Sequence, residues 1–475
     1  MTGELERLAA ACLFPGFDGL TLLDELRDWL EQGLGGVVLF ARNVRDREQL
    51  GALTAALRAE RPDLLVGIDE EGGDVTRLEA AGGSSYPGNH ALGAVDDLEL
   101  TEQVAAALGS DLAGVGINLD LAPVADVNTN PQNPVIGVRS FGADPELVAR
   151  HVAAFVSGLQ RVGVAACAKH FPGHGATEQD SHEELPTVSE GLENALLPFR
   201  AAVDGGVRCV MTAHIRVPQF GEAPATLNRE ILQGLLRGDL GFTGLVMTDA
   251  LEMRAVSATV GVEEGAVLAL RAGVDALCLG HDLPPGSVQR ALVDAVRTGR
   301  LDQGRLQEAA GRVSEAARWA SRAGPDPLAR GEVGAAAARR ALAIEGRVAL
   351  TRPPLVIELS PRPSIAAGEA GRGLGESIRS RLPATDVVRL SQAPRDAAGL
   401  LDGHAGRQLV VAVRDAHRHA WQRAVAEALL ERAGDGVVVE TGLPCWRPEA
   451  AAGYVATHGA GRVNLDAAAA LLAQE

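Results

Sequence analysis

The 475-residue chain contains a single lysine, Lys169, although Lys and Arg together number 44. Aromatic residues make up only 3% of the sequence, and the formal net charge is −18. An acidic surface repels phosphate backbones and anionic headgroups, so we expect neither a nucleic acid nor a membrane as partner. The scarcity of aromatic rings argues against an extended polymer groove lined with stacking platforms. This composition favours a small neutral molecule as the ligand.

Long apolar runs are also missing. The sequence has no stretch of about 18 apolar residues, and its N-terminus lacks a basic segment ahead of an apolar one. We therefore expect a soluble cytoplasmic protein without a signal peptide, either a monomer or a homodimer. The five cysteines are widely separated and mostly embedded in apolar runs, which is typical of reduced, buried thiols. Because no CxxC pair is present, the cysteines offer no zinc site, and we expect no metal or cofactor.

Eight short apolar runs recur in the first part of the chain, each bounded by Gly, Pro, Asp or Asn. Between them lie segments with apolar residues at i, i+3 and i+4, which is typical of amphipathic helices. Alternating strands and helices predict a parallel sheet with crossover helices, and eight such units close into a (β/α)₈ barrel. The expected strands cover residues 10–14, 36–40, 64–69, 116–123, 163–169, 208–214, 244–249 and 275–280.

Polar side chains stand at or just past the C-terminal end of nearly every expected strand. In a (β/α)₈ barrel this end is the catalytic face. One or two such residues would simply end an apolar strand, but this many charged and imidazole groups predict a site. The positions are Arg42–Asn43, Asp69–Glu71, Asp126–Asn128, Lys169–His170, His214, Asp249 and His281–Asp282.

The barrel pattern breaks after about residue 320, and a second set of apolar runs follows. We place the boundary between a barrel domain of residues 1–325 and a C-terminal domain of residues 326–475. The second domain is expected to be a smaller α/β sandwich with a parallel sheet. Its strands are expected at residues 354–359, 386–390, 408–413 and 436–441.

The segment "AKHFPGHGATEQDSH" carries the lone lysine and three histidines. An ammonium is compact and directs three donors at different oxygens, whereas a guanidinium is a wide planar fork. A crowded pocket full of hydroxyl groups therefore favours Lys169, although one lysine also survives codon bias by chance. The histidines permit a metal site as an alternative. The Pro and Gly between His170 and His174 and the nearby ammonium count against that alternative.

The same segment offers a proton-transfer pair. Asp180 and His182 lie two residues apart on a loop, close enough for the carboxylate to hold one imidazole nitrogen. Such a partner fixes the tautomer and raises the imidazole pKa, which makes His182 an acid–base group near neutral pH. The chain has no GxSxG elbow and no cysteine-centred motif, so Asp249 in "LVMTDALEM" is the candidate nucleophile.

These motifs resemble glycoside hydrolase family 3, specifically its β-N-acetylglucosaminidase branch. The resemblance spans residues 36–253 and is carried by "GVVLFARNV", "GIDEEGGDVTRL", "LAPVADVN", "VIGVRSFGADPE", "AKHFPGHGATEQDSH", "MTAHI" and "MTDALEM". It implies a two-step retaining hydrolysis in which Asp249 forms a covalent glycosyl-enzyme and Asp180 and His182 act as the acid–base dyad. It also implies sugar contacts. The residues expected to bind substrate are Asp69, Arg77, Arg139, Lys169, His170 and His214.

Several alternatives to an exo-acting hydrolase of terminal N-acetylglucosamine stay open. A neutral imidazole would not repel an anionic acceptor, so phosphate could replace water and make the protein a phosphorylase. A β-glucosidase and a non-catalytic sugar-binding protein are weaker candidates. The sequence also departs from the family at Asp74, where arginine is common, and at Glu70, where an amide is frequent. Losing a cation at position 74 is expected to alter the leaving-group side of the pocket.

Overall fold

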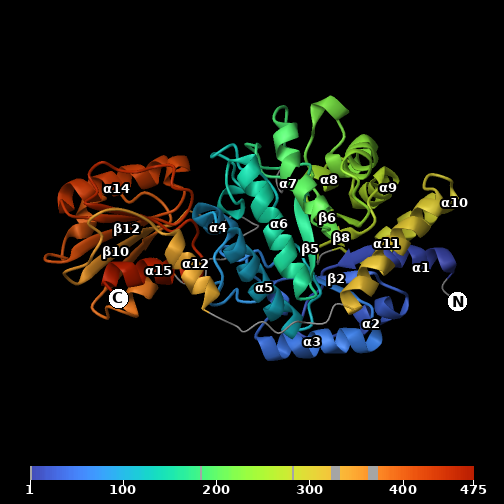
Figure 1. Cartoon of the computed structure of the whole chain (residues 1–475), viewed down its shortest axis with the longest axis horizontal. Helices are drawn as coiled ribbons and strands as arrows, with labels where there is room; N and C mark the ends of the chain where they lie inside the picture. Colours follow the sequence, from blue (N-terminus) through green and yellow to red (C-terminus); the bar gives the residue numbers. More distant parts are fainter. Residues whose placement is uncertain (1–2, 182–183, 281–282, 323–331, 362–372) are drawn as a thin grey trace. The chain divides into compact units, whose positions relative to one another are not determined.

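The computed structural model describes residues 3–181, 184–280, 283–322, 332–361 and 373–475 (Figure 1). The chain forms two compact units. Unit 1 consists of Met1–Glu70, Thr101–Ile136 and Ala143–Arg330, and unit 2 of Glu71–Leu100, Gly137–Gly142 and Gly331–Glu475. The predicted boundary between residues 325 and 326 lies outside the described residues. Two segments that we had assigned to the barrel domain, residues 71–100 and 137–142, make their closest contacts with the C-terminal part of the chain.

Unit 1 is a barrel of eight parallel strands, as predicted. Six strands form one sheet in the order β2-β3-β4-β5-β6-β7, and β1 pairs with β8. Thr248 N–H donates to Ala276 C=O at 2.9 Å, which joins β7 to β8, and Gly35 N–H donates to Ala10 C=O at 3.2 Å, beside β1 and β2. The strands are β1 (Leu13–Pro15), β2 (Gly36–Leu39), β3 (Leu65–Ile68), β4 (Leu119–Asp120), β5 (Ala165–Phe171), β6 (Cys209–Thr212), β7 (Leu245–Thr248) and β8 (Leu277–Leu279).

Amphipathic helices follow the strands, and α3 and α6 begin at an aspartate cap. Asp46 accepts from Gln49 N–H at 2.8 Å ahead of α3, and Asp144 accepts from Glu146 N–H at 3.0 Å ahead of α6. The helices on this part of the chain are α1 (Glu4–Ala11), α2 (Asp24–Glu31), η1 (Ala41–Asn43), α3 (Arg47–Glu60), α5 (Leu98–Gly114), α6 (Pro145–Arg161), α7 (Leu192–Asp204), η3 (Pro218–Phe220), η4 (Ala225–Leu227), the π-helix η5 (Glu230–Asp239), α8 (Arg254–Ser257), α9 (Val262–Ala272), α10 (Pro285–Arg297) and α11 (Gln303–Arg322). Among the described helices, none has both the length and the apolar composition that crossing a bilayer requires.

Unit 2 contains a six-stranded sheet in the order β11-β10-β12-β13-β14-β9. Five strands are parallel, the four predicted ones and β14, and the edge strand β9 runs antiparallel to β14. Alternate residues face opposite layers: Val356 packs with α13 and α15, whereas Leu355 and Ile357 pack with α14. The elements of this unit are α4 (Asn89–Val95), η2 (Gly137–Arg139), α12 (Val333–Ala341), β9 (Ala343–Gly346), β10 (Pro354–Leu359), α13 (Leu374–Arg379), β11 (Asp386–Leu390), η6 (Ala398–Leu401), β12 (Gln408–Val413), η7 (Ala416–Arg418), α14 (Ala420–Ala433), β13 (Val437–Glu440), β14 (Gly453–Ala456) and α15 (Arg462–Ala473).

Candidate active site

The lone lysine forms a buried ion pair at the carboxyl ends of the barrel strands. Lys169 lies in β5, and its Nζ atom is 2.7 Å from Oδ1 of Asp69, which directly follows β3. The Lys169 side chain is 2% exposed, whereas that of Asp69 is 21% exposed. Asp69 therefore keeps part of its surface exposed while it pairs with the buried ammonium. These two predicted sugar-binding residues lie side by side.

Asp126 binds His170 and His174, which follow Lys169 in the chain. Its Oδ2 atom is 2.7 Å from Nδ1 of His170, and its Oδ1 atom accepts from the backbone N–H groups of His170 at 3.3 Å and His174 at 2.6 Å. Because a carboxylate only accepts, Nδ1 of His170 carries a proton. Asp126 is fully buried. The sequence marked it as a polar strand-end residue without giving it a role, and the structure makes it the support of two histidines.

His174 connects Asp126 to the loop that bears the predicted dyad. Its Nδ1 atom is 2.9 Å from Thr177 Oγ1, and its Nε2 atom is 3.1 Å from Ser181 Oγ. Burial lowers the pKa of His174 to about 4, with Asp126 opposing the shift, so the ring is neutral at neutral pH. Asp180 is half-buried on the same loop, and His182 lies outside the described residues. His174 thus anchors the residue that separates the two dyad positions.

Asp249, the predicted nucleophile, directly follows β7 and is half-buried. Its Oδ1 atom accepts from Ala250 N–H at 2.8 Å. Its negative charge acts on His174. Burial first, and then the charge of Glu252, raise the pKa of the Cys278 thiol, and the charges of Asp249 and Asp69 add to this rise. The two carboxylates therefore lie near the same part of the barrel end.

His214 is fully buried behind Asp249. Its Nε2 atom lies 3.0 Å from the carbonyl oxygen of Ala250, and its Nδ1 atom lies 2.8 Å from Thr226 Oγ1. A carbonyl only accepts, so Nε2 carries the proton. We had expected His214 to bind substrate. Both of its nitrogens contact protein groups, and one of these contacts holds the peptide that follows Asp249.

Arg77 and Arg139 belong to unit 2. Arg139 ends η2 and makes a bidentate pair with Glu71, with Nε 2.9 Å from Oε2 and Nη2 2.8 Å from Oε1. Both side chains are buried. Such a pair fixes the plane of the guanidinium group. Arg77 is half-buried in the same unit.

Asp74, the departure from the family motif, is tied into unit 2. Its Oδ2 atom pairs with Arg414, and its Oδ1 atom accepts from the backbone N–H of Ala460 at 2.6 Å. The Asp74 side chain is only 5% exposed. The charge that replaces arginine here is therefore neutralised within the unit. It joins residues 71–100 to the C-terminal segment.

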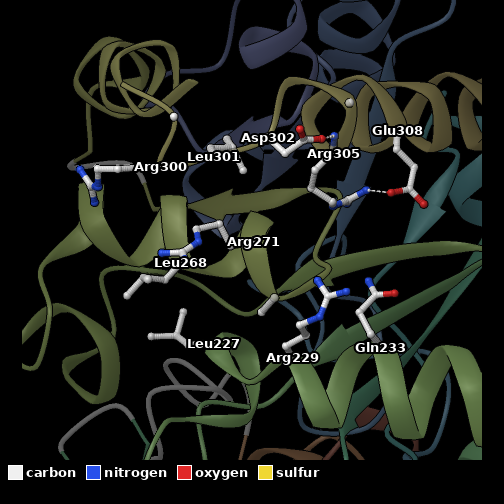
Figure 2. Close-up of a pocket in the computed structure, with 13 residues that line it drawn as sticks. Leu227, Arg229, Gln233, Leu268, Arg271, Arg300, Leu301, Asp302, Arg305 and Glu308 are labelled. Carbon is white, nitrogen blue, oxygen red and sulfur yellow. Dashed lines mark hydrogen bonds and ion pairs between the residues drawn. The ribbon is translucent and has the colours of Figure 1, made fainter. Parts of the chain in front are cut away.

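A pocket of about 730 Å³ lies elsewhere in unit 1, between the start of η5, the end of α9 and the connection from α10 to α11 (Figure 2). Arg305 in this pocket pairs with Glu308 at 2.6 Å, and Arg300 pairs with Glu264. None of the predicted site residues lines the pocket. Across the described part of the chain, no group of three His, Cys, Asp or Glu residues is arranged to hold a metal ion.

Comparison with known proteins identifies the family. The model of the glycosyl hydrolase family 3 N terminal domain matches residues 8–316. The chain belongs to glycosyl hydrolase family 3. Among family 3 relatives, the beta-hexosaminidase of Stenotrophomonas maltophilia (strain R551-3) is 37% identical over 311 residues, which cover 62% of this chain and 92% of that protein. Beta-hexosaminidase A of Pseudoalteromonas piscicida is 36% identical over 330 residues, and the match covers 62% of this chain but only 55% of that protein.

A solved family 3 structure extends the similarity to the C-terminal part. The β-N-acetylglucosaminidase from Paenibacillus sp. str. FPU-7 has a TM-score of 0.89 and 34% sequence identity, and the match covers 99% of this chain and 97% of that chain. The resemblance stated from the motifs is thus confirmed, and it includes both units of the family 3 chain.

Proposed function

We propose that the protein is a retaining, exo-acting β-N-acetylglucosaminidase that removes terminal non-reducing N-acetylglucosamine. The observation that carries this proposal is the buried Lys169–Asp69 pair at the same barrel end as Asp249. The near-complete match to the Paenibacillus β-N-acetylglucosaminidase supports it. Cell-wall fragments and chito-oligosaccharides that end in this sugar are the proposed substrates. Recycling of cell-wall fragments would put the protein in the cytoplasm.

The reaction proceeds in two displacements. In the first, a carboxylate oxygen of Asp249 bonds to the anomeric carbon while the bond to the leaving-group oxygen breaks and that oxygen takes a proton. In the second, a water molecule attacks the same carbon, loses a proton and releases Asp249. We assign both proton transfers to His182, oriented by Asp180, with neutral His174 anchoring the intervening Ser181.

The sugar is recognised by groups that a wrong ligand would leave unpaired. Asp69 accepts hydrogen bonds from hydroxyl groups at the end of the sugar chain, and the Lys169 ammonium orients it. A ligand that lacks those hydroxyl groups leaves the partly buried Asp69 carboxylate without their hydrogen bonds, and this weakens binding of that ligand. Recognition of the hydroxyl groups at the sugar terminus would favour a chain end over an internal residue.

The assignment of the nucleophile is tested with Asp249→Asn. We expect turnover of an aryl N-acetylglucosaminide to fall by about 10⁴-fold or more, because the amide cannot form the glycosyl ester. Asp302→Asn, at an exposed carboxylate on the separate pocket of unit 1, is the matched control and should retain activity. Retained activity in a folded Asp249→Asn protein would reject the assignment.

His182→Ala tests the acid, and phosphate tests the acceptor. Loss of the acid should slow substrates with poor leaving groups far more than aryl glycosides, whose leaving groups need little protonation. Equal losses on both substrates would count against His182. Product analysis with and without phosphate separates a hydrolase, which releases free sugar, from a phosphorylase, which releases sugar 1-phosphate.

A further inference from the structure

Asp120 is a fully buried carboxyl group beside the candidate site, and the proposed reaction does not use it. It ends β4, where it pairs in register with Ile68 of β3 and Ala166 of β5. Its Oδ1 atom accepts from the backbone N–H of Glu70 at 3.1 Å. Its Oδ2 atom has no hydrogen-bond partner among the described residues. Buried carboxyl oxygens are rarely left in this state, so Oδ2 requires an explanation.

The charges around Asp120 explain which form it takes. Glu70, Asp69 and Lys169 are the charged groups that act on it, and the Lys169 ammonium is already 2.7 Å from Asp69. An ionised Asp120 would add a negative charge to a buried site in which the nearby Lys169 ammonium already pairs with Asp69. Burial first, and then the charge of Glu70, raise the pKa of Asp120 well above its usual range, while Lys169 only partly opposes them.

We propose that Asp120 holds a proton on Oδ2 and is a positioning residue, which as a neutral acid leaves the Lys169 ammonium paired with Asp69. Once ionised, Asp120 competes with Asp69 for the ammonium, and Asp69 loses the partner that orients it. The effect on sugar binding rests on the proposed function, whereas the protonation of Asp120 is independent of it. Loss of this proton on the alkaline side therefore lowers kcat/KM.

The proton itself is tested by infrared difference spectroscopy at neutral pH. The wild-type spectrum minus that of Asp120→Asn should contain the carbonyl band of a protonated carboxylic acid. Asp111→Asn, which removes a buried carboxylate paired with Arg47 in the same unit, is the matched control. This variant keeps Asp120, so the wild-type spectrum minus that of Asp111→Asn should lack the band. Absence of the band from the Asp120→Asn difference spectrum would overturn the proposal. This readout needs no turnover, so it stands even if the protein does not cleave N-acetylglucosaminides.

The positioning role is tested by the pH profile of kcat/KM on an aryl N-acetylglucosaminide. Asp120→Asn keeps an oxygen that accepts from Glu70 N–H but cannot ionise. We expect its kcat/KM at pH 7 to lie within about threefold of the wild type and its alkaline limb to move to higher pH, while Asp111→Asn keeps the wild-type limb. A tenfold loss at pH 7, or an unmoved limb, would refute the role. If Asp120→Asn does not fold, Asp120→Ser supplies the same comparison.

Discussion

Replacing Lys169 by arginine preserves the charge and changes only the shape of the cation. The Lys169 side chain is 2% exposed and its Nζ atom is 2.7 Å from Asp69, so the larger guanidinium group has no solvent-filled space to enter. Overpacking of this kind typically costs about 1–3 kcal/mol unless neighbours shift. A shift of about 1 Å in a residue that positions the substrate costs on the order of 10²-fold in rate. We therefore expect Lys169→Arg to lower kcat/KM by about 10²-fold, equivalent to about 3 kcal/mol.

Steady-state kinetics on an aryl N-acetylglucosaminide measures this loss, and the urea midpoint reports whether the fold survives. The matched control is Arg47→Lys, an exchange in the opposite direction at the Arg47–Asp111 pair, where the arginine side chain is 35% exposed. This control should leave kcat/KM unchanged. A Lys169→Arg enzyme with kcat/KM within threefold of the wild type would refute the idea that the compact ammonium is required.

Two further predictions concern stability. Asp74→Ala should lower the free energy of unfolding by about 2 kcal/mol in urea denaturation, less than the roughly 3–5 kcal/mol of a fully buried pair because Arg414 is 27% exposed. Arg432→Ala, at an exposed pair, should cost less than about 1 kcal/mol, and equal losses in the two variants would contradict this reasoning. Burial lowers the pKa of His174 and of His458 from 6.5 to about 4, so as pH falls through this window the unfolded chain binds protons first and stability declines. Each imidazole contributes up to about 1.4 kcal/mol per pH unit, and His458→Gln should flatten the decline in urea midpoints between pH 7 and 4, whereas an unchanged slope would refute its contribution.

The barrel strands were predictable because each is a short apolar run followed by polar residues. The sheet of unit 2 was predictable only where the same pattern holds. All four residues of β9 are exposed, so this edge strand has no apolar alternation to reveal it. β14 spans only Gly453–Ala456 and was also missed. The contacts of residues 71–100 with the C-terminal part could not be predicted from the sequence either. Asp74 and Arg414 are 340 positions apart, and neither lies in a periodic pattern.

The motifs named the candidate site residues, but not the partners that the fold gives each of them. Lys169 and Asp69 were expected to bind the sugar together, and they form a pair. His214 was expected to face substrate, yet Ala250 and Thr226 occupy both of its nitrogens. Residue type and position at a strand end do not fix which way an imidazole turns. That depends on partners supplied by other segments, here Thr226 in η4 and Ala250 after β7.

Asp126 links the predicted sugar-binding residues to the loop of the proposed dyad. One carboxylate binds the His170 ring beside Lys169 and the backbone N–H of His174, and His174 in turn contacts Ser181. His170, a predicted sugar-binding residue, and His174, which contacts the loop of the proposed dyad, are therefore held by the same buried group. Because a half-satisfied buried network is unfavourable, a disturbance at Asp126 should not remain on one side of the site. We therefore expect a substitution at Asp126 to disturb both His170 and the loop that bears Asp180.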